Sequence, residues 1–328
     1  GSATGVRAGR RRMTRFMLGR VSRAALSLLL LTLLVHGGLA LLPGDPIRAL
    51  FGPVRPDPAV YQAMRDQFNL NEPWIVQYGL YLKDLVTGNW GASFPGIVRG
   101  VATVGPPIGD IVAAAAPVSA KLVAPVLAVQ LFVGAALGAI AAVFHRRPTG
   151  TGVYFAAVAF LGIPVIALAY VLQMVFAWEL GWVPTRGLDG WPSYVLPVTA
   201  LSLTTACLLI LFAREHLRDV LQQPFMKAPV ARGIKPLRVV GIHAMKVSLP
   251  SFLTLIAANL GHLITSLIIV ENIFGIPGLG SAMYVAIFQR DRALIIAMLL
   301  LVAATIATVN LLVDASQAIL DPRMKENL

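Results

Sequence analysis

The chain has 328 residues, of which 57% are hydrophobic, and its mean hydropathy is +0.76. These values are too apolar for a soluble domain and indicate a polytopic membrane protein. The formal net charge of +12 does not indicate a nucleic-acid-binding protein, because the basic residues stand in blocks beside apolar runs and are not interleaved with aromatic residues. The positive-inside rule explains this charge more simply.

The N-terminal region, residues 1–21, is basic and leads into the first apolar run at 22–42. This run has about 20 residues, enough to cross a hydrocarbon layer of about 30 Å. A signal peptide is the competing interpretation, but no small-residue cleavage site follows the run. Residues 1–3 look like a cloning remnant, and Met13 is the expected native start. The N-terminus is expected in the cytoplasm because seven arginines precede or begin the run: Arg7, Arg10, Arg11, Arg12, Arg15, Arg20 and Arg23.

Residues 43–118 form the longest polar region, and their acidic and basic residues are nearly balanced. Such a balance is typical of an extracytoplasmic region, since cytoplasmic loops carry an excess of Lys and Arg. The turn-forming residues at 43–46 follow the first span, and 57–69 and 73–87 are predicted as short surface helices.

Five further apolar runs predict an all-α membrane protein with six transmembrane helices. The remaining spans are expected at 120–144, 153–178, 195–213, 249–272 and 293–317. Pro125 and Pro164 are expected to mark kinks, and Gly134 and Gly138 form a small-xxx-small pair suited to close helix packing. With both termini inside, the cytoplasmic segments hold 18 Lys and Arg and the outer segments hold 8, as the positive-inside rule requires.

The basic segment at 214–250 interrupts the apolar pattern, with seven Lys or Arg against two acids. Its first part, 215–226, is predicted as a short amphipathic helix, with an apolar face of Leu217, Val220, Leu221 and Phe225. Pro229 and Gly233 are expected to interrupt regular helix, and a basic helix is expected to resume at 235–247. On composition alone, a solvated positive-inside loop remains the alternative.

The order of residues in this segment resembles the EAA-type coupling loop of ABC importer permeases, in the form used by the dipeptide/oligopeptide branch. The positions that carry the resemblance are Arg214, Phe225, Lys227, Ala228, Ala231, Arg232, Gly233, His243 and Leu249-Pro250. Pro229 departs from the usual alanine. Further strings are similar to the same family: LPGDP at 42–46, a stretch at 67–94, LPVTALSL at 196–203, ENIFGIPGLG at 271–280, and 310–323. The LPGDP string and the long first outer loop are typical of the B-type (DppB/OppB-like) permease.

The resemblance implies a type I ABC importer permease fold. It comprises TM1 at 22–42, an extracytoplasmic region at 43–118, a core domain at 119–322 and a cytoplasmic tail at 323–328. A cytoplasmic coupling helix between helices 4 and 5 would lie in the loop 214–248. The implied partners are a second, C-type permease, two ATP-binding subunits that carry ATP and Mg, and an extracytoplasmic solute-binding protein. The implied location is the bacterial inner membrane, with both termini cytoplasmic, and no cofactor or metal is expected in this chain.

Three groups of candidate residues follow from this interpretation. The residues expected to couple to the ATPases are Phe225, Lys227, Ala228, Pro229, Arg232, Gly233 and Arg238. Polar candidates for the substrate pathway are Gln173, Ser202, Thr205, Asn259, His262 and Ser266. Such residues in spans more often form interhelical hydrogen bonds than ligand contacts. Candidates for an extracytoplasmic gate or binding-protein contact are Asp45, Trp90, Phe274, Pro277 and Gly278.

Several features argue that an external subunit drives this chain. The sequence has no GxxxxGK[ST] string and therefore no phosphate-cradling loop of its own. Its spans hold almost no ionisable residues, which ion-coupled transporters keep near the midplane. The glycines of 271–280 do not indicate phosphate binding, because no strand precedes them.

Alternatives remain open for both the solute and the class of protein. The same architecture could import haem, nickel or another peptide-like solute instead of dipeptides or oligopeptides. A stand-alone secondary transporter or channel is the more distant alternative, and a membrane-embedded enzyme is more distant still, since no catalytic arrangement of side chains is visible. Cys207 is expected to be a packing residue.

Overall fold

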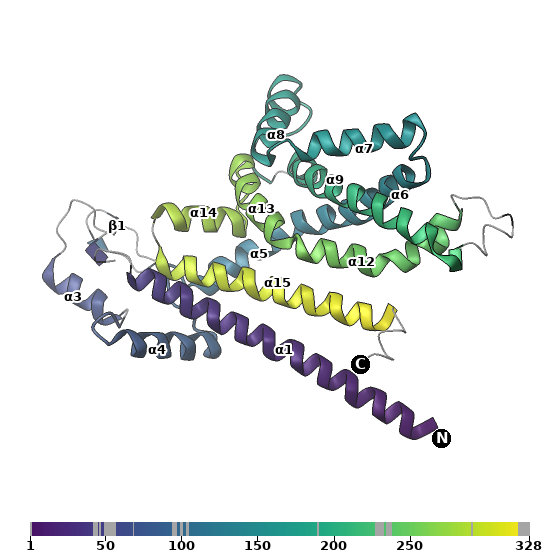
Figure 1. Cartoon of the computed structure of the whole chain (residues 1–328). Helices are drawn as coiled ribbons and strands as arrows, with labels where there is room; N and C mark the ends of the chain where they lie inside the picture. The colour runs from purple at the N-terminus through teal and green to yellow at the C-terminus, as the bar shows by residue number, and fades with distance from the viewer. Residues whose placement is uncertain are drawn as a thin grey trace.

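The computed structural model describes residues 2–41, 45, 47–48, 57–67, 69–93, 97–98, 101–102, 105–188, 190–226, 233, 238–289 and 291–320. The two long helices α1 (Ser2–Leu41) and α15 (Arg292–Leu320) lie side by side along a helical bundle (Figure 1). One end of the bundle, which we call the outer end, carries α3 (Pro58–Gln67), α4 (Trp74–Thr87) and the paired strands β1 (Ile97–Val98) and β2 (Val101–Ala102). At the opposite, inner end, α1 begins and α15 ends.

The helix α9 (Pro192–Gln222) is the centre of the bundle. On one side it packs against a continuous helical run made of α5 (Ile108–Val129), the π-helical segment η1 (Gln130–Gly134) and α6 (Ala135–Val143). It also contacts four further helices: α7 (Pro148–Leu161), α8 (Val165–Leu172), α12 (Met245–Ala258) and α13 (Leu260–Phe274). The remaining elements are η2 (Gln173–Glu179), η3 (Val239–Ala244) and α14 (Leu279–Gln289).

Five helices of the described chain are long and apolar enough to cross a membrane: Gly19–Gly38, Ile108–Val143, Pro192–Gln222, Val239–Ala258 and Ala293–Gln317. Two further stretches qualify only as bent pairs, α7 with α8–η2 and α13 with α14, so the total lies between five and seven. The prediction of an all-α membrane protein is confirmed, since the only strands in the described residues are the two-residue β1 and β2. The predicted number of six spans lies within the range of five to seven.

Three predicted helices differ from the observed ones. The expected third span, 153–178, is broken at 162–164, where α7 and α8 meet at 97°, because Gly162 and Pro164 end one helix and begin another. The kink expected at Pro164 is thus confirmed, as a full break of the helix. The expected fifth span, 249–272, is divided at Asn259 between α12 and α13. The expected separate helix at 215–226 is largely the continuation of α9, which ends at Gln222. Pro125 lies inside α5 without breaking it.

The apolar face predicted for 215–226 is present in part. Leu217 and Val220 are buried, and both belong to a core cluster with residues of α6 and α12. Leu221 packs against the same cluster. Phe225, in contrast, is 50% exposed, whereas its neighbour Met226 is buried in the same cluster.

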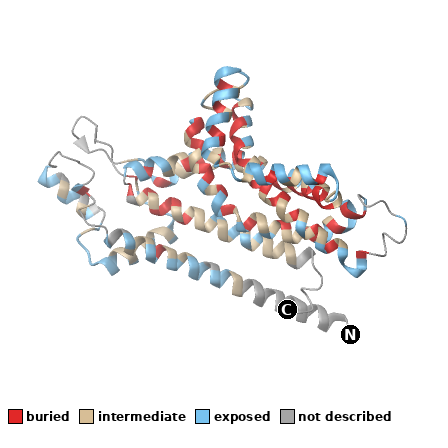
Figure 2. Cartoon of the chain, turned by 45° about the horizontal axis from the view of Figure 1, so that its top comes forward, coloured by how far each residue is buried: buried red, intermediate tan, exposed pale blue. Residues whose placement is uncertain are grey.

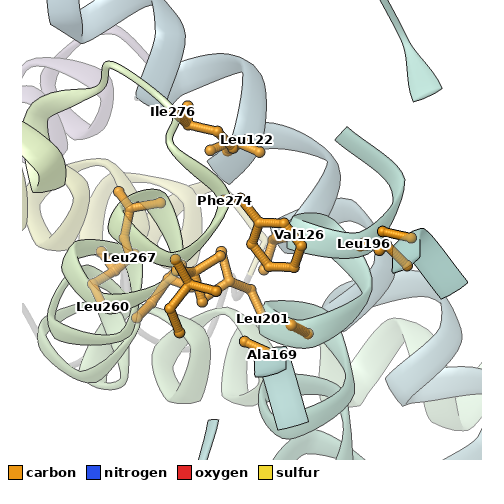
Figure 3. Packing of buried hydrophobic residues seen from close by; sticks show 14 residues of the cluster. Leu122, Val126, Ala169, Leu196, Leu201, Leu260, Leu267, Phe274 and Ile276 are labelled. Atoms are coloured by element: carbon orange, nitrogen blue, oxygen red, sulfur yellow. The ribbon is translucent and has the colours of Figure 1, made fainter. Parts of the chain in front are cut away.

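The largest core cluster joins α5, α8, α9 and α13 near the outer half of the bundle. Figure 3 shows its side chains converging, among them Leu122 and Val126 of α5, Leu201 of α9 and Phe274 of α13. Buried residues concentrate where these helices meet, whereas α1 and α4 present mostly exposed and intermediate residues (Figure 2). Large apolar side chains on the outside of α1 suit contact with lipid rather than water.

Gly134 and Gly138 lie where the α5–η1–α6 run crosses α9. A Cβ at Gly138 would stand 2.6 Å from Cβ of Ala213 and 3.0 Å from the carbonyl oxygen of Ile210. A Cβ at Gly134 would stand 3.1 Å from side-chain atoms of Leu209. The two helices therefore approach more closely than any side chain at Gly138 would allow, and the predicted packing role of this pair is confirmed.

Polar contacts fix both ends of the bundle. At the inner end, Arg20 of α1 pairs with Asp314 of α15 at 2.5 Å. At the outer end, the hydroxyl of Ser93 donates to a carboxylate oxygen of Asp291 at 2.5 Å, and the same carboxylate accepts the backbone N–H of Leu294. Asp291 thus caps the start of α15 and attaches the loop after α4 to it.

Candidate functional site

Glu271, at the end of α13, is fully buried and is the hub of a polar cluster. One carboxylate oxygen accepts the hydroxyl of Ser119 from α5 at 2.6 Å, and the other accepts the backbone N–H of Ser281 at 3.0 Å. The backbone N–H of Gly280 also donates to Glu271. The N–H of Leu279 completes the ring by donating to Oγ of Ser119 at 2.8 Å. We call Ser119, Glu271 and the backbone of 278–281 the Glu271 cluster.

The cluster caps the beginning of α14. The first N–H groups of a helix have no partner within the helix and carry partial positive charge, so a carboxylate there is stabilised. Glu271 supplies that carboxylate from within the chain. The glycine-rich string at 271–280 looks like a phosphate-binding loop. In the structure, the amides of Gly280 and Ser281 bind an internal anion instead, the carboxylate of Glu271.

Two glycines leave room for this arrangement. A Cβ at Gly278 would lie 2.2 Å from Oε1 of Glu271, and a Cβ at Gly280 would lie 2.7 Å from Cα of Ile268. A third, Gly275, ends α13 in the left-handed conformation, with φ +64°, which glycine adopts without steric strain. The chain then turns by 85° into α14.

Gln173 attaches the loop after η2 to the same bend. Its side-chain amide donates to the carbonyl of Thr185 at 2.8 Å and to that of Ile273 at 3.2 Å, and the N–H of Gly187 donates to the carbonyl of Phe274 at 3.1 Å. The predicted pathway residue Gln173 is buried and links the loop after η2 to the end of α13.

The side-chain hydrogen bonds of the other pathway candidates, where the described chain has them, stay within single helices. Ser202, Thr205 and Ser266 are buried, Asn259 is half-buried and His262 is exposed. Thr205 donates to the carbonyls of Leu201 and Ser202 one turn earlier in α9, and Asn259 donates to that of Leu255. These bonds within single helices leave the pathway assignments as predictions.

The gate candidates separate into two groups. Phe274 and Gly278 are buried and Pro277 is exposed, all at the bend beside Glu271. Trp90 is half-buried and packs in a second cluster with Ile108, Met298 and α14. Asp45 lies in a network with α3.

Sequence reasoning singled out the glycines of the bend but missed Glu271 and Ser119, since nothing local marks a serine in an apolar span.

Asp45 accepts the Tyr61 hydroxyl and the backbone N–H groups of Ile47 and Arg48, and Arg65 lies 3.5 Å away. Partial burial raises the pKa of Asp45, but these hydrogen bonds and the charge of Arg65 outweigh it and hold the pKa below its ordinary value. The LPGDP aspartate thus links the backbone of Ile47 and Arg48 to α3.

The Asp45→Asn variant is expected to destabilise the folded protein by about 1 kcal/mol, an amount reduced by partial exposure. Because the pKa of Asp45 is lower in the folded than in the unfolded protein, its ionised carboxylate stabilises the fold at pH values above its ordinary pKa. This stabilisation is lost as the pH falls through the pKa of the folded state. The difference in thermal unfolding from wild type should therefore be constant between about pH 5 and 8 and should shrink only under more acidic conditions. The exposed Glu72→Gln serves as control. A difference that vanished already near neutral pH would contradict this account.

Comparison with known proteins identifies the family. Residues 134–326 match the family described as binding-protein-dependent transport system inner membrane component. The glutathione transport system permease protein GsiC of Escherichia coli K12 is 30% identical over 313 residues, which cover 95% of this chain and 99% of that protein. The same protein of Salmonella typhi is 31% identical over 314 residues. This chain belongs to that family. It is a non-catalytic, membrane-spanning permease subunit of an ABC importer, and the DppB/OppB-like resemblance is confirmed.

The permease's basic segment is described only at its two ends and at Gly233. Phe225 and Arg238 are exposed, and Gly233 has φ +75°, as expected of a glycine at a bend. Lys227, Ala228, Pro229 and Arg232 lie outside the described residues. Arg214 is held in the bundle, since its guanidinium stacks 4.3 Å from the ring centre of Tyr154 and pairs with Glu215. The end of α9 and the start of η3, which both belong to this segment, lie at the inner end (Figure 1).

Proposed function

We propose that this permease forms, with a second permease, the membrane pathway of an ATP-driven importer for dipeptides and oligopeptides. The observation that carries the proposal is similarity over nearly the whole chain to permeases named for glutathione, which is itself a tripeptide. Two ATP-binding subunits would supply the energy, because the sequence has no phosphate-cradling loop. An extracytoplasmic binding protein would deliver the solute.

The inner end would face the cytoplasm, and α3 and α4 would face the outside. The excess of Lys and Arg in the segments assigned to the inner side supports this orientation. The basic segment would then lie in a groove of an ATPase subunit, where its guanidinium and ammonium groups can pair with acidic side chains.

The solute class can be tested with the assembled transporter in proteoliposomes, supplied with its binding protein and ATP. Uptake of a labelled dipeptide, a tripeptide, glutathione, nickel and haem would be compared. Peptide uptake that depends on both ATP and binding protein is expected. Uptake of nickel or haem in place of peptides would favour the alternative solutes, and accumulation by the permease alone would favour a secondary transporter.

Two variants test the coupling role of the basic segment. Arg232→Glu reverses a charge that would pair with the ATPase, and Gly233→Pro imposes a negative φ where the chain has +75°. Each is expected to lower solute-stimulated ATP hydrolysis by about tenfold, which corresponds to about 1.4 kcal/mol of lost coupling. The control is Gly152→Ala, whose Cβ would meet nothing within 4 Å. Wild-type hydrolysis and uptake in both variants would remove this role from the segment.

A further inference from the structure

Glu271 is fully buried, and its hydrogen-bond donors in the described chain are one hydroxyl and two backbone amides. No Lys, Arg or His of the described residues pairs with it in an ion pair. A buried carboxylate without a countercharge is expensive, because desolvation opposes it and only dipoles compensate. A neutral side chain could cap α14 at a smaller penalty, so capping alone does not explain a glutamate here.

The cluster lies where two long helical runs meet at the outer end. One run, α5–η1–α6, carries Ser119 and extends along α9 toward the inner end. The other, η3–α12–α13, starts at Val239 within the basic segment and ends at Phe274, three residues beyond Glu271. The inner parts of the two runs also touch, because α6 contacts η3.

The third element of the cluster, α14, connects it to the rest of the outer end. It packs against α5, α13 and α15, and its residues Ala282, Met283 and Ala286 share a cluster with Ile108 and Met298. The loop after α4 enters the same cluster through Trp90. A change in the angle between α5 and α13 would therefore move α14 and the surrounding outer surface together.

We propose that Glu271 and Ser119 are positioning residues for transport: they lock the α13–α14 bend to α5, so that movement of η3 and α12 at the inner end is transmitted to the outer mouth of the pathway. This rests on the proposed importer function. The carboxylate suits the role because it accepts three donors from two other elements at once, whereas a hydroxyl or an amide oxygen accepts fewer.

The test uses the assembled transporter with its binding protein, and the measured quantity is the number of solute molecules imported per ATP hydrolysed. Glu271→Ala and Ser119→Ala are expected to lower this ratio by about tenfold, since each leaves buried donors or acceptors without partners, while ATP hydrolysis without solute continues. Glu271→Gln should recover part of the ratio, because its amide oxygen still accepts the N–H of Ser281. Hydrogen exchange at 279–284 should accelerate in the alanine variants.

Ser193→Ala is the matched control. Ser193 is buried at the start of α9, and its hydroxyl has no hydrogen-bond partner in the described chain. If the variants of the Glu271 cluster unfold at lower temperature but keep the wild-type ratio per assembled complex, the cluster only stabilises the fold and the proposal is overturned. An equal loss of the ratio in Ser193→Ala would overturn it as well. Failure of the wild-type complex to import any peptide would instead contradict the proposed function.

Discussion

The Gly278→Ala variant is expected to destabilise the permease by about 3 kcal/mol, at the upper end of typical overpacking effects. The new Cβ would lie 2.2 Å from Oε1 of Glu271 and 2.4 Å from its Cδ and Oε2, well inside contact distance. The carboxylate would have to move, and the donors from Ser119 and Ser281 would then be left unpaired in a buried site. Gly278 does not have a positive φ, so the effect is purely steric.

Thermal unfolding of the purified transporter, compared between variants, measures this effect. The matched control is Gly261→Ala in α13, the helix that carries Glu271. Its Cβ would meet only Cδ1 of Ile306, at 4.0 Å. Because alanine has a higher helix propensity than glycine, the control should be neutral or stabilising by up to about 1 kcal/mol. Equal unfolding temperatures for the two variants would show that Glu271 does not occupy this position.

Hydropathy predicted the membrane helices because lipid requires long apolar runs with internal hydrogen bonds. It could not predict direction changes. Four prolines at 117, 125, 197 and 250 lie inside unbroken helices, whereas the chain turns by 97° just before Pro164. The difference lies in Gly162, two residues before Pro164. Glycine has a low helix propensity, and proline lacks the backbone N–H that a helix needs, so the two together end the helix.

The amphipathic segment shows what a local pattern can and cannot predict. Leu217 and Val220 share a helical face, and they are buried as predicted. The separate helix was not observed because no glycine or proline stands between the fourth span and Pro224, so nothing ends α9 earlier. Phe225 lies beyond the end of α9, so the period of that helix does not predict its burial, and it is exposed.

The Glu271 cluster was partly visible in the sequence. The string 271–280 was singled out by its family resemblance and by the gate candidates Phe274, Pro277 and Gly278, but the 85° turn there was not predicted. The partner of Glu271 was not predictable, because Ser119 is 152 positions away and a serine in an apolar span has many equivalent roles. Only the packing of α5 against α14 brings the two side chains together.

The Gly138→Leu variant is expected to separate α6 from α9 and to prevent stable assembly, with a loss above about 3 kcal/mol. In a membrane, helices are held together by close packing rather than by the hydrophobic effect, so a spacer between two backbones removes the contact itself. The Cβ atom of the new side chain alone would lie 2.6 Å from Cβ of Ala213 and 3.0 Å from the carbonyl oxygen of Ile210. The yield of detergent-stable transporter after size-exclusion chromatography measures the outcome.

A graded series separates this steric cause from a general effect of mutating the span. Gly138→Ala should be milder than Gly138→Leu, and Gly134→Ala milder still, because its Cβ would meet its nearest atoms, Cβ and Cδ2 of Leu209, at 3.1 Å rather than at 2.6 Å. Adding Ala213→Gly to Gly138→Ala removes the closest clashing atom and should restore part of the stability, although the contact with the Ile210 carbonyl remains. A double variant no more stable than Gly138→Ala alone would contradict the close approach of α6 and α9, since a real clash must be relieved when either of its two atoms is removed.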